Sequence, residues 1–242
     1  MVPENLQNKI DAMNEAWKKM ESHEQEECEI DFVARFTHHS TALGGNALTE
    51  DEIRKILIEH VVPKAMPLRE LDDIRGHEAA WRMVKRASEK KKPLSENLIK
   101  DIHQAAIPMP GVGGIYRTVP LSVRGARHVP PSPDKVRAKM KYLIADYGYR
   151  EFGSSIEKAA WLHAQFYKIH PFVEGSGRTA RLLLNYQLML DGMPPTFVKK
   201  DNAQRYYKAL DTYAEEDNLR PFCDLVKETL EQEIDEFMSH LK

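Results

Sequence analysis

Apolar residues recur at steps of three and four along most of the chain, and this spacing constrains the fold more than any other feature. Such spacing puts apolar side chains on one face of an α-helix, whereas a half-buried β-strand alternates strictly between apolar and polar residues. The pattern therefore predicts a mostly α-helical chain. Its first stripe consists of Leu6, Ile10, Met13, Trp17 and Met20.

Capping residues mark where several of these helices should begin. Thr49 and Glu52 have the spacing of a capping box, and Ser95 is a typical N-cap residue ahead of a short apolar run. By contrast, we expect the acidic run Glu24–Glu29 to be a solvated turn between helices. The other periodic runs lie at 71–84, 136–147, 156–169, 178–190 and 226–241.

The segment Gly111–Pro133 breaks the helical pattern. It has Gly and Pro at both ends and short β-prone runs around Gly125. This composition predicts a loop that leads into one β-hairpin, followed by irregular chain. We therefore expect one mostly α-helical domain with a single hairpin, and no second domain is needed for the 242 residues.

Composition and charge exclude several classes of protein. Thirty-five Lys and Arg oppose 37 Asp and Glu, and the formal net charge of −2 argues against a general nucleic-acid binder. No apolar run approaches the roughly 20 residues that span a bilayer, and the first residues lack the apolar stretch of a signal peptide. Cys28 and Cys223 lie far apart and do not make a disulfide scaffold or a zinc module. We expect a reduced, cytoplasmic, soluble protein.

Reactive groups are concentrated in the twelve residues His170–Arg181, HPFVEGSGRTAR. Gly175–Gly177 directly precede a predicted helix, where unhindered backbone N–H groups at the positive end of the helix dipole can hold an anion. Arg178 and Arg181 are three residues apart on that helix, so both guanidinium groups project toward one side and can clamp phosphate oxygens.

Two further side chains complete the set. Glu174 supplies a hard oxygen ligand that suits Mg²⁺, an ion that itself holds phosphates. His170, placed at a helix end by Pro171, can take up a proton near neutral pH. A Gly-x-Gly before a helix or a His at a helix end is usually only structural. Their combination within twelve residues is what phosphoryl or nucleotidyl transfer requires.

This motif resembles the signature of the Fic domain (filamentation induced by cyclic AMP), HPFx(D/E)GNGRxxR, and departs from it at one position. The resemblance extends over most of the chain and implies an all-α, Fic-type helical bundle with one β-hairpin flap. It implies a single domain over 1–242, with an inhibitory-helix region at about 1–60, the flap at about 111–133 and the catalytic motif at 170–181. Other segments that resemble the family are Gly114–Arg117, His128–Pro131, Leu182–Gly192, Tyr206–Tyr207 and Arg220–Phe222.

Fic enzymes typically transfer AMP from Mg–ATP to a hydroxyl of a protein and release pyrophosphate. By resemblance, His170 deprotonates a Ser, Thr or Tyr hydroxyl of a target protein or of the chain itself, and Glu174 holds Mg²⁺. The backbone amides of Gly175–Gly177 seat the phosphates, and Arg178 braces them. Arg181 binds the γ-phosphate.

The resemblance also implies where the target and the nucleoside bind. The flap would lie along the target, whose extended chain can add as a strand to the hairpin edge. Tyr206 and Tyr207 are candidates for the adenosine pocket, and they equally suit a helix with two partly buried tyrosines. Fic domains also often form homodimers. The flap residues that would contact the target are Val123, Arg124, Gly125, Ala126, Arg127 and His128.

Ser176 stands where the family usually has Asn. A serine keeps a hydroxyl but loses the reach and the two amide donors of Asn, so the phosphates would be oriented less firmly or mainly by the backbone. Removal of a single oxyanion donor costs on the order of 3 kcal/mol in the worst documented type of case. The departure is compatible with a slower enzyme and does not require an inactive one.

A second departure concerns inhibition. Many Fic proteins carry an inhibitory helix with the pattern (S/T)xxxE(G/N), whose Glu pairs with the second motif arginine and blocks the γ-phosphate. Ser40 and Gly45 fit this pattern, but Gly44 stands in place of the Glu. Our hypothesis is a de-inhibited chain in which Arg181 is free for ATP and reverse removal of AMP is weak. The two glycines also suit the plain end of a helix.

Three other hypotheses stay open. Ser176 allows a nucleotide-binding pseudoenzyme or interaction module that has lost turnover. A different donor, such as UTP or a choline-bearing nucleotide, also fits, because the motif recognises phosphates better than bases. A metal-dependent phosphohydrolase would use His163, His170 and Glu174, but His163 precedes His170 by seven residues on what we expect to be one buried helix face.

Overall fold

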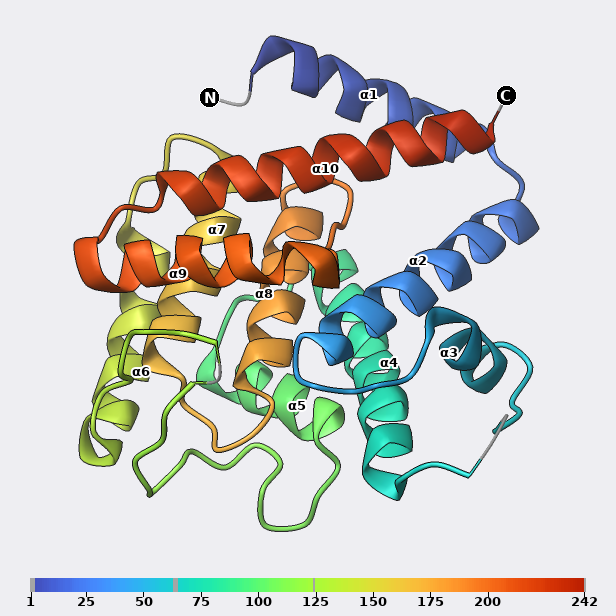
Figure 1. Ribbon diagram of the computed structural model, residues 1–242. Coiled ribbons are helices and arrows are strands. Elements are labelled where there is room, and N and C mark those ends of the chain that lie inside the picture. Colours follow the sequence, from blue (N-terminus) through green and yellow to red (C-terminus); the bar gives the residue numbers. More distant parts are fainter. Residues whose placement is uncertain (1–2, 63–64, 124, 242) are drawn as a thin grey trace.

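The computed structural model describes residues 3–62, 65–123 and 125–241, and most of them are helical (Figure 1). The prediction of a mostly α-helical chain is therefore confirmed. The elements in chain order, of which η1 is a short 3-10 helix, are α1 (Glu4–Lys19), α2 (Ser22–Ala42), α3 (Glu50–Leu57), α4 (Leu68–Glu89), α5 (Glu96–Ala106), α6 (Pro133–Tyr149), α7 (Ser155–Ile169), α8 (Ser176–Leu190), η1 (Lys200–Asn202), α9 (Ala203–Glu216) and α10 (Arg220–His240).

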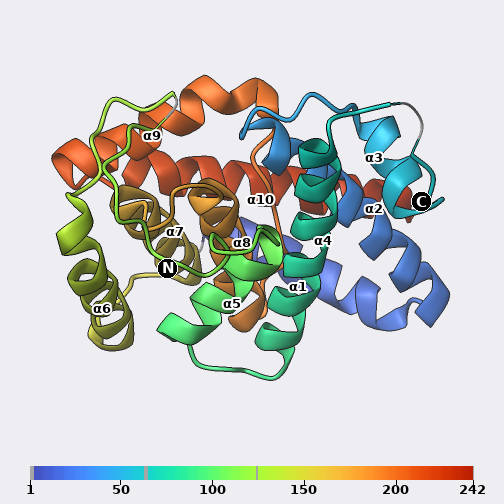
Figure 2. The same cartoon turned by 90° about the horizontal axis from the view of Figure 1, so that it is seen from below.

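Helices α7 and α8 pack side by side at the centre of the fold, with α4, α5, α6, α9 and α10 around the pair (Figure 2). Most residues of α8 are buried, including polar ones that find partners inside the protein. The side chain of Asn185, for example, exchanges hydrogen bonds of 2.8 and 2.9 Å with the backbone of Thr196. A helix that is buried on nearly all sides needs neighbouring elements on each of them. Helix α8 therefore holds the core together.

The terminal helices lie against each other on one side of this core, where α1 runs along α10 (Figure 1). Leu6 and Ile10 of α1 are buried, and Lys9 forms an ion pair of 2.7 Å with Asp235 of α10. The predicted first stripe is thus confirmed as the contact face of a helix. Further along it, Trp17 is only partly buried.

The acidic run Glu24–Glu29 lies inside α2, so the predicted turn was wrong. The helix begins at Ser22 because Glu21 and Glu24 form a capping box, in which each side chain pairs with the backbone of the other residue. Negative charge in the first turn is also favourable at the positive end of the helix dipole. The turn lies just before the acidic run, between α1 and α2.

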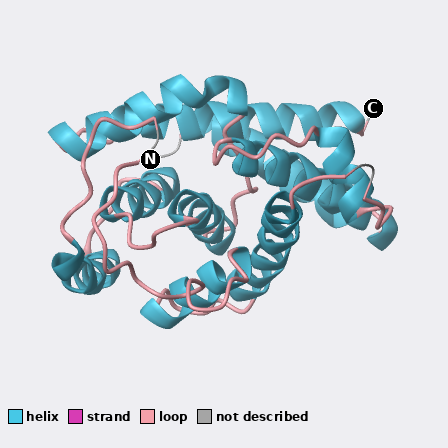
Figure 3. Ribbon diagram, turned by 60° about the horizontal axis from the view of Figure 1, so that its bottom comes forward, coloured by secondary structure: helices cyan, strands magenta, loops and turns pink. Residues whose placement is uncertain are grey.

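The segment 111–133 forms no β-hairpin in its described residues, so this prediction was also wrong (Figure 3). Pro120, Pro130 and Pro131 cannot donate hydrogen bonds to a partner strand. The carbonyls of Val119 and Pro131 instead accept hydrogen bonds from the guanidinium group of Arg117. We call this segment the flap; it is an irregular loop that side chains hold in place.

Two predicted helix starts are confirmed. Thr49 caps α3 through a capping box with Glu52, and Ser95 caps α5 by accepting the N–H of Leu98. Each cap satisfies backbone donors that the first turn of a helix otherwise leaves without partners. Within the described ranges, every helix is too short or too polar to cross a membrane.

We expect Leu183→Ala to lower the free energy of unfolding by about 2–5 kcal/mol, because Leu183 of α8 is fully buried and its truncation leaves a cavity. Leu68→Ala is the matched control, since Leu68 is 71% exposed and its truncation should change the stability by no more than about 0.5 kcal/mol. Urea denaturation followed by circular dichroism measures both variants. Equal effects would show that α8 does not hold the core together.

Candidate active site around His170

His170 ends α7 in a backbone conformation that few residues adopt. Its φ of 47° lies in the left-handed region, and its N–H donates to the carbonyl of Phe166 at 2.9 Å. Arg117 of the flap fixes this turn. Its Nε donates to the His170 carbonyl at 2.8 Å, and its backbone N–H donates to the carbonyl of Pro171 at 2.9 Å. The start of the motif and the flap are therefore joined through one buried arginine.

The His170 imidazole is partly buried beside an aromatic ring. It packs edge-on against Tyr167, with the ring centroids 5.5 Å apart. Burial, helped by the nearby His128 and Arg117, lowers the pKa of His170 to about 4. At neutral pH the ring is therefore uncharged and able to accept a proton.

His103 of α5 joins the glycine loop of the motif to the flap. Its Nε2 donates to the carbonyl of Glu174 at 2.7 Å, and its Nδ1 accepts the N–H of Gly114 at 2.8 Å. A backbone N–H can only donate, so the proton of this imidazole lies on Nε2. Burial lowers the pKa of His103 to about 4, which keeps the ring neutral. Its ring also stacks on Phe172, with centroids 3.6 Å apart.

Gly175 is required by the geometry of this loop. Its φ is 78°, and a Cβ at this position would lie 2.5 Å from the side chain of Ile107. Helix α8 begins at the next residue. Its first turn leaves backbone N–H groups without partners inside the helix, which is the condition for holding an anion.

The Ser176 hydroxyl is used within the loop. It accepts the N–H of Phe172 at 3.0 Å and donates to the carbonyl of Phe172 at 3.1 Å, and the residue is completely buried. In this arrangement the hydroxyl fixes the shape of the loop and is not available to a phosphate. Only the backbone N–H of Ser176 belongs to the anion-binding turn.

Arg178 and Glu174 lie together with two residues of α4. Arg178 is buried and donates to Asp73, while Glu174 accepts from Arg69 and lies 3.6 Å from Arg178. Burial lowers the pKa of Arg178, and Asp73 opposes this effect. The Glu174 carboxylate borders the first turn of α8, so it suits a Mg²⁺ that is shared between one carboxylate and phosphate oxygens. Arg69 is exposed and can leave this carboxylate.

Arg181 is not free, contrary to our expectation. Its Nε donates to the Ser40 hydroxyl at 2.9 Å, one terminal nitrogen donates to the Ser40 carbonyl at 2.6 Å, and the other donates to the Tyr206 hydroxyl at 3.3 Å. Among the described residues, all hydrogen-bond partners of this buried guanidinium are uncharged. Gly44 lies just beyond α2, and its N–H donates to the carbonyl of Thr41 at 2.9 Å.

The two tyrosines of α9 lie in different surroundings. Tyr206 is completely buried, and its hydroxyl lies 3.0 Å from Nε2 of His163. Tyr207 is half-buried, and its hydroxyl donates to the carbonyl of Leu43 at 2.9 Å. In this structure the Tyr206 ring therefore does not line an open pocket. His163 is completely buried, which agrees with its expected place in the core.

Asp211 of α9 anchors the flap. Its buried carboxylate accepts the backbone N–H of Arg127 at 2.9 and 3.0 Å and that of His128 at 3.2 Å. It also lies 3.3 Å from Nδ1 of His128. Because charged acceptors form the stronger hydrogen bonds, this carboxylate holds the two flap residues firmly against α9.

The rest of the predicted target segment lies along the same side. Val123 and Ala126 pack against the main core, and Gly125, with a φ of 82°, lies against the ring of Tyr207. A Cβ at Gly125 would lie 3.0 Å from that ring, so the close contact needs a glycine. Arg124, the remaining predicted residue, lies outside the described residues.

His103 and Asp211 are not among the site residues predicted from the sequence. Each is a buried polar residue on the apolar face of a helix, between Ile102 and Ala106 in α5 and beside Leu210 in α9. A polar residue at such a position needs a partner, and this is the signal by which both could have been found.

Comparisons with known proteins show what this chain is similar to. The sequence model of the Fic/DOC family matches residues 93–188, which contain the motif. The protein adenylyltransferase Fic of Drosophila willistoni is 31% identical over 212 residues, which cover 85% of this chain and 42% of that protein. The one of Drosophila virilis is 30% identical over 212 residues, which cover 85% and 43%. The chain thus spans less than half the length of these relatives.

Solved structures share the fold. A Fic domain containing signaling protein from Bacteroides thetaiotaomicron matches with a TM-score of 0.83 at 24% identity, over 94% of this chain and 95% of that chain. Fic-1 from C. elegans matches with a TM-score of 0.83 at 27% identity, over 97% of this chain and 69% of that chain. From its motif, its helical fold and these relatives, the chain is a Fic/DOC family protein and a distant homologue of the protein adenylyltransferases named Fic.

Proposed function

We propose that the chain is a protein adenylyltransferase, which transfers AMP from Mg–ATP to a Ser, Thr or Tyr hydroxyl of a target protein or of itself. The observation that carries this proposal is the partly buried, uncharged imidazole of His170, whose backbone Arg117 holds in place. The first turn of α8, which follows the same loop, supplies backbone N–H groups for phosphates. The names of the homologues support the same reaction.

His170 would take the proton of the attacking hydroxyl, whose oxygen forms a bond to the α-phosphorus while pyrophosphate leaves. Arg178 and the N–H groups of Gly175–Gly177 would hold phosphate oxygens and stabilise their charge. Glu174 would hold Mg²⁺, which neutralises phosphate charge when it is bound. For this, Glu174 exchanges the exposed Arg69 for the ion.

Arg181 would bind the γ-phosphate after it has released Ser40. A charged phosphate forms stronger hydrogen bonds than the neutral hydroxyl and carbonyl of Ser40 that it replaces. Because Gly44 carries no side chain, it brings no carboxylate to compete for this guanidinium. We therefore propose that the chain is de-inhibited, and that its removal of AMP from targets is weak for the same reason.

A nucleotide-binding Fic module without turnover is the second candidate. It is favoured by the Ser176 hydroxyl, which bonds to the backbone of Phe172 and leaves phosphate binding to N–H groups and arginines. The identity of the nucleotide that donates the transferred group is a separate question, because backbone N–H groups recognise phosphates and not bases. Replacement of labelled ATP by labelled UTP in the first assay below tests it.

We expect His170→Ala to lower AMP incorporation by about 10²–10⁴-fold, because it removes the general base and leaves the proposed phosphate ligands in place. The measurement uses α-labelled ATP with Mg²⁺, and mass spectrometry locates the AMP-sized addition. His23→Ala, at an exposed histidine of α2, is the matched control and should label normally. ATP-dependent thermal stabilisation of the unsubstituted chain without any label would favour the module instead.

We expect Gly44→Glu to slow self-modification about tenfold or more, since hydrogen bonds between charged groups contribute about 1.5–3 kcal/mol. A side chain at residue 44 needs only a small shift, because its Cβ would lie 3.1 Å from the Thr41 carbonyl oxygen. Gly44→Gln has the same size without the charge and should remain active. If Gly44→Glu labels as fast as the unsubstituted chain, the de-inhibition hypothesis is wrong.

We expect Asp211→Asn to release the flap, because the amide replaces a charged acceptor that holds the N–H groups of Arg127 and His128. Trypsin should then cleave after Arg127 about tenfold faster, and AMP incorporation should fall. Glu216→Gln, at an exposed carboxylate of the same helix, is the control. Unchanged cleavage would mean that other contacts hold the flap.

A further inference from the structure

A cavity of about 460 Å³ lies at the opposite end of α8 from the motif. Its wall comes from α1, α2, α4, the last residues of α8 and α10. Pockets for small molecules commonly have about 300–1,000 Å³, so the size suits a small ligand. No residue proposed for the transfer of AMP lines this cavity.

The cavity lies beside the second half of α1, where the apolar stripe of this helix is less completely buried. Leu6 and Ile10 are 0% and 2% exposed, whereas Met13 and Trp17 on the same stripe are only partly buried and line the cavity. An apolar stripe of a helix is normally covered along its length. Here Met13 packs against the core and also borders the cavity, so the second half of the stripe is only partly covered.

Aromatic and methionine side chains form much of the wall. Aromatic rings stack on flat apolar groups and attract cations to their faces. Methionine side chains adapt their shape to the molecule they contact. The residues concerned are Trp17, Phe32, Trp81 and Phe237, with Met13, Met189 and Met193.

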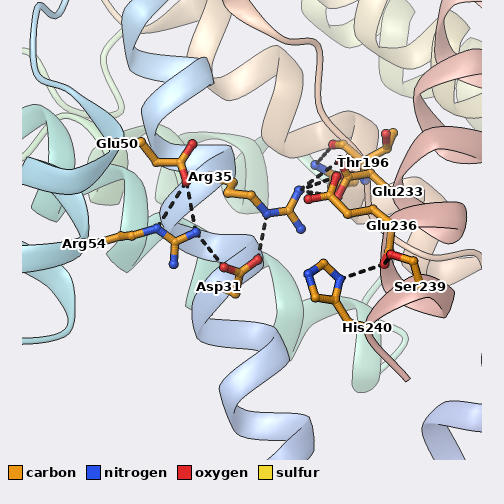
Figure 4. Close-up of polar contacts among 10 residues, drawn as sticks. Asp31, Arg35, Glu50, Arg54, Thr196, Glu233, Glu236, Ser239 and His240 are labelled. Carbon is orange, nitrogen blue, oxygen red and sulfur yellow. Dashed lines mark hydrogen bonds and ion pairs between the residues drawn. The ribbon is translucent and has the colours of Figure 1, made fainter. Parts of the chain in front are cut away.

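Carboxylates outnumber cations on the same wall, by five to two. Arg35 is shared among three of them: it lies 2.7 Å from Asp31, 2.8 Å from Glu233 and 3.6 Å from Glu236 (Figure 4). One guanidinium group cannot neutralise three carboxylates. Asp31 is further paired with Arg54 of α3, which does not line the cavity.

The other cation, Lys85, pairs with Glu29. Glu27, the fifth carboxylate, forms no ion pair with any described residue and is exposed at the cavity. The aromatic wall thus carries a surplus of negative charge. This combination repels anions and favours a ligand that is both apolar and positively charged.

We propose that this cavity binds a small organic cation with a flat apolar body, such as an arylalkylamine. The body lies among the aromatic rings, and the ammonium group lies at the carboxylates, with Glu27 available as its direct partner. The site is separate from the proposed transfer of AMP and does not rest on it.

Cys28 gives a readout that does not depend on activity, because it lines the cavity. The chain has one other cysteine, Cys223, which is also free but packs against the main core. We expect phenylpropylamine to slow the alkylation of Cys28 by iodoacetamide and to leave Cys223 unaffected. Mass spectrometry of the two peptides measures both rates in one sample.

Phenylpropanol and phenylpropionate have the same body with a neutral and an anionic group. Because an accessible ion pair contributes up to about 1 kcal/mol, which is about fivefold in affinity, the amine should protect Cys28 at concentrations several-fold lower than the alcohol. The carboxylate should protect it least of the three.

We expect Glu27→Gln to weaken protection by the amine about two- to fivefold and to leave protection by the alcohol unchanged. Glu26→Gln is the matched control, since Glu26 is the exposed neighbour in α2 that does not line the cavity. Both substitutions are at exposed positions and leave the fold intact.

Several results would overturn the proposal. Equal protection by all three ligands would show that charge does not select the ligand. Absence of protection, or equal protection of both cysteines, would show that the cavity is not a binding site. An effect of Glu26→Gln as large as that of Glu27→Gln would show that no specific carboxylate receives the ammonium group.

Discussion

The packing of α7 against α8 fixes the candidate site, because only six residues, 170–175, join the two helices. A connection this short brings the end of α7 next to the beginning of α8. The first contributes an imidazole in a left-handed turn, and the second contributes the positive end of a helix dipole. The proposed general base and the proposed phosphate-binding turn thus become neighbours through burial of apolar surface.

The loop between these helices would not keep its shape by apolar packing alone, since it contains many buried polar groups. His103 joins the Glu174 carbonyl of the loop to the flap, the Ser176 hydroxyl bonds to the backbone of Phe172, and Arg117 bonds to the His170 carbonyl. Each of these polar side chains is buried, and removal of one would leave its partner unsatisfied. The loop is therefore held in one arrangement by the protein alone.

Arg181 shows how such a network can still admit a ligand. A buried guanidinium that has lost all its partners is strongly unfavourable, and Ser40 and Tyr206 prevent this in the absence of nucleotide. Since both partners are neutral, a phosphate can replace Ser40 without breaking an ion pair. The same network explains how the hydroxyl of Tyr206 can be buried, because it accepts a hydrogen bond from Arg181.

Local signals in the sequence predicted the helices and the motif well. The caps at Thr49 and Ser95 and the twelve residues from His170 to Arg181 are recognisable because each depends on neighbours in the chain. The β-hairpin failed for the opposite reason. Pro120, Pro130 and Pro131 within the segment argue against a hairpin, but the contacts that hold the segment, such as those to Asp211, come from residues far away in sequence.

The contact of Arg181 with Ser40 was likewise beyond local patterns. The motif (S/T)xxxE(G/N) pairs this arginine with its Glu, and it therefore predicts a free guanidinium where Gly44 replaces the Glu. The structure shows that the hydroxyl and carbonyl of Ser40 accept hydrogen bonds from this guanidinium instead. A buried guanidinium donates hydrogen bonds to whatever acceptor is near. The loss of one acceptor therefore predicts that another takes its place.

Helix α2 connects the candidate site to the cavity at the other end of α8. Asp31 lines the cavity, and Ser40 lies nine residues further along the same helix, at a distance of about 14 Å along its axis. The middle of α2 is tied to α3 and α10 by the ion pairs of Asp31 with Arg54 and of Arg35 with Glu233. Its end is held at α8 by neutral hydrogen bonds to Arg181. Since neutral hydrogen bonds exchange more readily than the partly buried ion pairs, the end of α2 at Ser40, and not its ion-paired middle, is where the helix can yield to the proposed phosphate.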